Sequence, residues 1–79
     1  MALTDKDREW GEKAALFLKA ELKRAKVGYK ELAERLREHG LDENETTITG
    51  KLARGSFPVS FWLACLTVLE LGETTLSDL

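Results

Sequence analysis

Apolar residues recur at helical spacing along most of this 79-residue chain, and no stretch alternates for long enough to predict a strand. The clearest run follows Thr4 and Asp7, whose spacing is that of a helix capping box. A helix is therefore predicted over residues 5–25, and the chain as a whole is predicted to be all-α. The apolar positions of this first helix are Trp10, Ala14, Phe17, Leu18, Leu22 and Ala25.

The second predicted helix covers residues 29–39. Gly28 suits its N-cap. The pair His39-Gly40 supplies a stop signal, because glycine readily ends a helix and histidine can bond its last carbonyl groups. We assign this capping role to His39 in preference to a catalytic one.

Two further helices are predicted, over residues 45–54 and 58–71. Either Asp42 or Asn44 suits the N-cap of the first of them. Pro58 suits the start of the second, because its fixed backbone angle is that of a first helical turn. Gly72, one residue beyond the helix over residues 58–71, is the predicted stop of that helix.

A chain of this size has room for one compact core, so residues 1–79 are predicted to form a single domain. The tail over residues 73–79 is ambiguous, and the bundle therefore has four helices or five. The single cysteine excludes an intramolecular disulfide and indicates a reducing compartment. The chain begins with charged residues, and its longest apolar run is far shorter than the roughly 20 residues of a membrane span. We therefore predict a cytoplasmic protein without a membrane segment.

The chain offers little of the chemistry that an enzyme or a metal site needs. One histidine and one cysteine cannot fill a tetrahedral zinc site, and no glycine-rich phosphate loop is present. Cys65 lies in an apolar run, where a core or interface thiol is expected rather than a reactive one. No catalytic residue, metal, cofactor or small-molecule ligand is predicted.

Three segments carry a family resemblance. They are Tyr-Lys-Glu-Leu-Ala-Glu-Arg-Leu from Tyr29, Thr-Thr-Ile-Thr-Gly-Lys-Leu-Ala-Arg-Gly from Thr46, and Phe-Pro-Val from Phe57. Together they resemble the phage repressor and Cro-like (lambda repressor-like) helix-turn-helix fold. The chain also resembles a small bacterial family of unknown function, in which a tryptophan-led first helix, a Tyr-x-x-Leu-Ala segment and a Lys-Leu-x-Arg-Gly segment recur.

The helix-turn-helix resemblance implies how the two central helices pack. A small residue in the first of them, matched here by Ala33, lets the second pack closely across it. Apolar residues matched by Ile48 and Leu52 anchor the second helix to the core, and the pair Arg54-Gly55 closes it.

The same resemblance implies a recognition helix that enters the major groove of double-stranded DNA. Threonine hydroxyls bond base edges or phosphates, and lysine and arginine reach guanine or neutralise phosphate. The supporting helix crosses the phosphate backbone in this motif, so Lys26 and Lys30, with Arg35 and Arg37, are expected to contact phosphate. Glycine in the recognition helix permits close approach of the backbone. The recognition residues are Thr46, Thr47, Thr49, Gly50, Lys51 and Arg54.

Three features depart from the helix-turn-helix pattern. The connection between the two central helices is several residues longer than usual, and the spacing from Ile48 to Leu52 is one residue wider. Asp42, Glu43 and Glu45 precede the recognition helix, where they would repel phosphate. The alternative to a DNA-binding protein is a protein-interaction module that uses the same fold without DNA.

The last predicted helix is apolar on nearly every face, whereas an amphipathic helix buries one stripe. The apolar surface of this helix beyond one stripe lies at the centre of the bundle, under the tail, or against a second copy of the chain. Helix-turn-helix proteins commonly read two half-sites as two-fold dimers. We therefore predict a homodimeric, sequence-specific DNA-binding transcriptional regulator. Its predicted interface residues are Phe61, Trp62, Leu63, Leu66 and Leu69.

Overall fold

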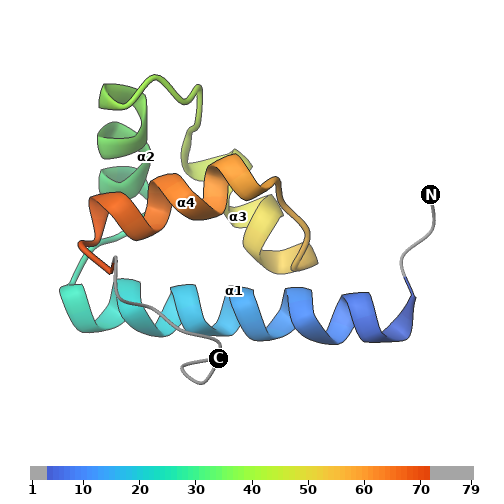
Figure 1. Cartoon of the computed structure of the whole chain (residues 1–79). Helices are drawn as coiled ribbons and strands as arrows, with labels where there is room; N and C mark the ends of the chain where they lie inside the picture. Colours follow the sequence, from blue (N-terminus) through green and yellow to red (C-terminus); the bar gives the residue numbers. More distant parts are fainter. Residues whose placement is uncertain (1–3, 72–79) are drawn as a thin grey trace.

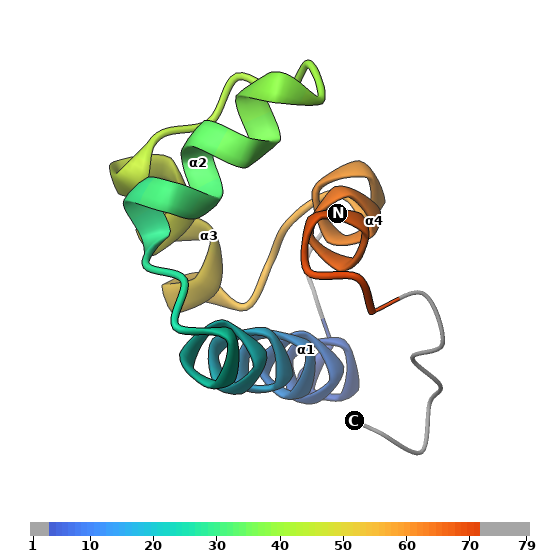
Figure 2. The same ribbon diagram turned by 90° about the vertical axis from the view of Figure 1, so that its left-hand side faces the viewer.

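Four helices make up the part of the chain that the computed structural model describes, residues 4–71. They are α1 (Asp5–Ala25), α2 (Tyr29–Glu38), α3 (Glu45–Arg54) and α4 (Val59–Val68), and no strand occurs among these residues. α1 lies along the base of the bundle, and the three shorter helices pack above it (Figure 1). In the view along α1, α3 and α4 lie on opposite sides (Figure 2). The predicted all-α bundle is confirmed, and residues 73–79 lie outside the described part.

Side-chain caps define the starts of α1 and α3. The hydroxyl of Thr4 accepts from the Asp7 N–H at 3.1 Å, and the Asp7 carboxylate accepts from the Thr4 N–H at 3.0 Å. The Thr4 hydroxyl also donates to the Asp7 carboxylate at 2.8 Å, and the two bonds that this carboxylate accepts from Thr4 hold the pKa of Asp7 below its usual value. Asn44, one of the two candidates, caps α3 in a reciprocal pair with Thr47. The predicted bounds of both helices are confirmed.

α2 ends at Glu38, one residue before the predicted end, because the chain turns there in a Schellman motif. Gly40 has a φ of 88°, and its N–H donates to the Arg37 carbonyl while that of Leu41 donates to the Leu36 carbonyl. Leu41 then packs on the core. His39 is the C-cap residue of α2, and its Nδ1 lies 3.0 Å from the Arg35 carbonyl oxygen.

α4 is shorter than predicted at both ends. Pro58 is its N-cap rather than its first helical residue. At the other end, Glu70 adopts a left-handed conformation with a φ of 59°, and the Leu71 N–H donates to the Leu66 carbonyl at 2.8 Å. The helix therefore ends before Gly72, the predicted stop, since backbone hydrogen bonds close it without a glycine.

All four helices supply the buried core, which lies between α1 and the three helices above it. Ile48 and Leu52 of α3 are buried as predicted. Trp10 and Ala25, two of the apolar positions of α1, are exposed, because both lie toward the ends of a 21-residue helix that extends beyond the ten-residue helices packed on it. The core comprises Ala15, Leu18, Leu22, Val27, Leu32, Ala33, Leu36, Ile48, Leu52, Phe61 and Cys65.

α1 and the end of α3 approach each other closely at two glycines. A Cβ atom on Gly11 would lie 2.0 Å from the carbonyl oxygen of Gly55, which is far inside van der Waals contact. Gly55 caps α3 at a φ of 63°, a left-handed conformation that favours glycine. Gly11 was not singled out from the sequence, because its requirement comes from the end of another helix.

The thiol of Cys65 is fully buried in the core. Burial raises its pKa from 9.0 to about 12, and the negative charge of Glu43 adds to that effect. Cys65 is therefore a core residue, as one of the two sequence-based alternatives held. A thiol protonated to so high a pH is a poor nucleophile.

We expect this thiol to make the fold sensitive to alkali. The unfolded chain loses the thiol proton near pH 9.0, while the folded chain keeps it to about pH 12. Its contribution to stability is thus fully present below pH 9 and is lost as the pH rises toward 12. Urea titrations at pH 8 and pH 10.5 measure the loss, and Cys65→Ala provides the control for other groups that titrate there. An identical decline in both proteins would contradict the assignment.

Candidate functional site

α2 and α3 pack against each other and are joined by an extended connection over residues 39–44. Ala33 is buried in α2, and Ile48 and Leu52 anchor α3 to the core. The anchoring of α3 by Ile48 and Leu52 is as the sequence predicted. The opposite face of α3 is consequently left toward solvent.

The exposed face of α3 carries two threonines with different hydrogen-bonding capacity. The hydroxyl of Thr49 donates to the Glu45 carbonyl at 2.8 Å, so it is left only as an acceptor for an outside group. Thr46 is exposed, and its hydroxyl makes no hydrogen bond within residues 4–71. It is free both to donate and to accept.

Arg54 lies back along α3 across Gly50. A Cβ atom at Gly50 would lie 3.1 Å from Nη1 of Arg54, tighter than an ordinary contact. The missing side chain thus leaves room for the guanidinium group on this face of the helix. The sequence had assigned Gly50 to close approach of DNA, and the structure gives it this additional role.

The prediction that Lys51 points outward is wrong. Its ammonium group lies 2.9 Å from both carboxylate oxygens of Glu43, and the side chains of the pair are 19% and 9% exposed. The ammonium also lies 5.4 Å from the centre of the Phe61 ring. Lys51 is turned inward because the extended connection places a carboxylate over the core, where an ion pair compensates part of its desolvation.

Thr47 also faces inward, contrary to the prediction. Its hydroxyl donates to Oε1 of Glu43 at 2.7 Å and accepts from the Asn44 N–H. The Arg37 guanidinium donates to the main-chain carbonyl of Glu43 at 2.8 Å. These contacts hold the connection over residues 39–44 against α3. Arg37 therefore has a structural role in that connection.

The contacts of Glu43 change the electrostatics expected beside α3. The sequence suggested that this carboxylate repels phosphate, but its charge is balanced by Lys51. Asp42 and Glu45 remain exposed near the start of α3. Arg35 is bound to Glu31 and donates to the carbonyl of Val68 on α4, so it lies on the side of α2 away from α3.

Two lysines stand at the corner between α1 and α2. Lys26 closes α1 in a left-handed conformation with a φ of 59°, and Lys30 lies in the first turn of α2. Both are exposed, and neither forms an ion pair with another described residue. Gly28 caps α2 without a side-chain hydrogen bond. The corner therefore offers positive charge to an anion.

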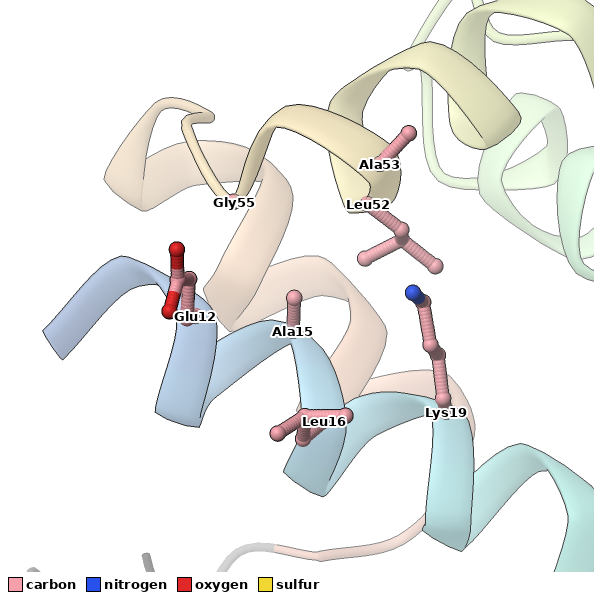
Figure 3. A pocket seen from close by; sticks show the side chains of 7 residues that line it. All are labelled: Glu12, Ala15, Leu16, Lys19, Leu52, Ala53 and Gly55. Carbon is pink, nitrogen blue, oxygen red and sulfur yellow. The ribbon is translucent and has the colours of Figure 1, made fainter. Parts of the chain in front are cut away.

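A shallow hollow separates α1 from the C-terminal half of α3 (Figure 3). Lys19 reaches from α1 toward α3 at one end of it, and Glu12 stands at the other. Lys19 was not assigned a role from the sequence, because only the packing of α1 against α3 brings it to this face. The hollow is lined by Glu12, Ala15, Leu16, Lys19, Leu52, Ala53 and Gly55.

The exposed face of α4 differs from the predicted interface by two residues. Phe61 is 1% exposed and belongs to the core, so it cannot contact a partner in this fold. Val59, which was not predicted, is 71% exposed, and Leu63 is 56% exposed. The half-buried residues of the predicted set are Trp62, Leu66 and Leu69.

A family model described as a domain of unknown function (DUF6471) matches residues 10–74. The chain belongs to this family. The match begins at Trp10 and takes in α2, α3 and α4, in agreement with the expected small family of unknown function. It indicates no repressor family. No curated protein and no solved structure matches the chain.

No helix within residues 4–71 is long and apolar enough to span a bilayer. The same residues contain no group of three or more histidine, cysteine, aspartate or glutamate side chains placed to hold a metal ion.

Proposed function

We propose that this chain is a sequence-specific DNA-binding protein, a bacterial transcriptional regulator of the cytoplasm, that reads the major groove with the exposed face of α3. The observation that carries the proposal is the combination of Thr46, Thr49 and Arg54 on that face of a helix-turn-helix pair. No catalytic role is proposed for these groups.

The side chains of the α3 face suit base edges. An arginine guanidinium donates two parallel hydrogen bonds to guanine, and threonine bonds several base edges or touches the thymine methyl. Arg54 lies back over Gly50, so its guanidinium is carried on the helix surface rather than beyond its end. The hydroxyl of Thr46 is free to donate, whereas that of Thr49 only accepts.

The cations around α3 suit the phosphate backbone. Lys26 and Lys30 stand at the corner where a supporting helix meets phosphate in this motif, and Lys19 flanks α3 from α1. The ion pair between Glu43 and Lys51 removes one of the three carboxylates that weighed against DNA. The same pair takes Lys51 from the cations offered to DNA, and Lys19, Lys26, Lys30 and Arg54 remain.

The test is selection of a preferred duplex from a random library, followed by titration of variants against it and against an unrelated duplex. Arg54→Ala is expected to weaken the preferred duplex about 5- to 150-fold, corresponding to roughly 1–3 kcal/mol, and to weaken the unrelated duplex much less. Arg24→Ala is the matched control, because Arg24 is an exposed arginine of α1 paired with Glu21. Equal effects of both variants would contradict the assignment of Arg54.

The Lys26→Gly variant distinguishes the loss of a phosphate contact from the loss of folding. Glycine relieves the left-handed strain at this position, so the variant is expected to be more stable by about 1 kcal/mol. It nevertheless loses a cation, and we expect weaker binding to all duplexes with a smaller salt dependence. If the parent protein binds no duplex at about 50 mM salt, DNA binding is excluded. The exposed apolar face of α4 then favours the protein-interaction module.

A further inference from the structure

The segment that runs from the middle of α1 into α2 carries a large excess of positive charge. Between Glu12 and Glu31 the one carboxylate is that of Glu21, which pairs with the Arg24 guanidinium at 2.7 Å. The lysines of this segment are exposed and make no ion pair within residues 4–71. Their charge is therefore available to a partner outside the chain. The cations of the segment are Lys13, Lys19, Lys23, Arg24, Lys26 and Lys30.

Three of these lysines, Lys19, Lys23 and Lys26, follow one another along one side of α1, and we call them the α1 lysine stripe. Their spacings of four and three residues are those that bring side chains together on a helix surface. Lys19 reaches from α1 toward α3 (Figure 3), and Lys26 is the C-cap of α1. The stripe therefore begins beside α3 and ends at the corner where Lys30 opens α2.

The contacts of α1 show that the stripe lies on the side of α3 and not on the side of α4. Ala15, one turn before Lys19, lines the hollow between α1 and α3. On the other side of α1, the ring of Phe17 lies 5.9 Å from that of Trp62 on α4. Figure 2 shows α3 and α4 on the two sides of α1 in the same way. Glu21 is one turn after Phe17, so the carboxylate of this segment lies away from the stripe.

The stripe flanks the proposed reading face of α3. Ala53 lines the hollow together with Lys19 and is itself exposed. Thr49 lies one helical turn before Ala53 and therefore on the same edge of α3. The major groove is about 12 Å wide, so side chains that stand beside a helix in the groove meet the phosphates at its edges. The stripe is thus placed against one sugar-phosphate backbone.

The linear shape of the stripe suits an extended polyanion. Its members span about 10 Å of α1, at a rise of roughly 1.5 Å per residue. A single phosphate ion needs donors that converge on one point, whereas a DNA strand offers a charge about every 3.4 Å along its axis. Lysine is adapted to such a surface, because its ammonium group is a point charge on a flexible stem and needs no fixed geometry.

We propose that the α1 lysine stripe binds the phosphate backbone along one edge of the major groove. This inference rests on the proposed DNA binding by α3. It adds Lys23 to the phosphate contacts and gives the C-terminal half of α1 a part in DNA binding. Because phosphates are the same in every sequence, the stripe contributes affinity and salt dependence but no base preference.

The experiment measures the affinity of Lys19→Gln and Lys23→Gln for the preferred and the unrelated duplex between about 50 and 200 mM salt. Lys13→Gln is the matched control, because Lys13 is exposed on α1 but lies over the Trp10 ring, off the stripe. Each stripe variant is expected to bind both duplexes more weakly and by the same factor. Over this range of salt its affinity should fall about 3- to 4-fold less than that of the parent, which is the contribution of one phosphate contact. The control is expected to match the parent.

Lys19→Arg keeps the charge and is expected to keep the salt dependence of the parent. Circular dichroism verifies that all variants are folded. An unchanged salt dependence in both stripe variants, or an equal change in Lys13→Gln, would overturn the inference and leave the reading of DNA by α3 standing. A loss confined to the preferred duplex would also overturn it, since that result indicates a base contact. A parent protein that binds no duplex overturns the proposed function and this inference together.

Discussion

Replacing Lys51 with alanine is expected to lower the free energy of unfolding by about 3 kcal/mol, most of what a domain of this size possesses. The variant leaves the carboxylate of Glu43 without its ion-pair partner, in a place where its side chain is only 9% exposed. The Thr47 hydroxyl alone then compensates the buried charge. Urea denaturation followed by circular dichroism measures the loss.

The double variant Glu43→Gln with Lys51→Met tests the reason for this loss. It removes both charges, keeps a hydrogen-bonding partner for Thr47, and keeps an unbranched side chain against Phe61. We expect it to regain most of the stability that Lys51→Ala loses, because no unpaired charge is left. The exposed pair of Lys6 and Glu9 supplies the comparison, where Lys6→Ala should cost well under 1 kcal/mol. An equally small cost at Lys51 would show that Glu43 is not buried as described.

The ion pair of Lys51 also determines how DNA-binding experiments on this residue are interpreted. The sequence predicts Lys51 as an outward cation of the recognition helix, yet its ammonium group is bound to Glu43. A loss of DNA binding in Lys51→Ala would therefore report unfolding. Arg54, Lys26 and Lys30 are exposed cations whose substitution leaves the described core contacts intact.

Gly11→Ala is expected to destabilise the fold by at least about 2 kcal/mol, in spite of alanine's higher helix propensity. Alanine gains about 1 kcal/mol over glycine inside a helix. The added Cβ, however, lies 2.0 Å from the carbonyl oxygen of Gly55. The Cβ is fixed rigidly to the backbone of α1 and the oxygen belongs to the backbone, so neither can turn aside. α1 must move away from α3, which opens the core around Ala15 and Leu52, and overpacking of this kind outweighs the propensity.

A thermal melt of Gly11→Ala measures this effect, and Gly28→Ser is its control. A side chain at Gly28 meets nothing within 4 Å, and serine there supplies the missing N-cap of α2. We expect the control to melt slightly above the parent and Gly11→Ala to melt far below it. A Gly11→Ala protein as stable as the parent would mean that α1 and α3 do not cross at the two glycines.

The local features of this protein follow from its sequence. The capping residues Thr4 and Asn44 and the stop at Gly55 define α1 and α3, because each acts on backbone groups within a few residues. The helical spacing of Ile48 and Leu52 similarly identifies the buried side of α3. Thr46, Thr49 and Arg54 could be named from the sequence because the opposite side of an anchored helix faces solvent.

The tertiary structure decided the features that depend on residues distant in the chain. Periodicity places Lys51 on α3, but the extended connection that brings Glu43 to it made it an internal ion-pair partner. α4 is apolar all round, so no periodic signal selects Phe61 for the core and Leu63 for the surface; contact with the other helices makes that choice. Gly11 is required only because α3 ends against it. In each case the sequence supplies the side chain, and the packing of a second element determines what surrounds it.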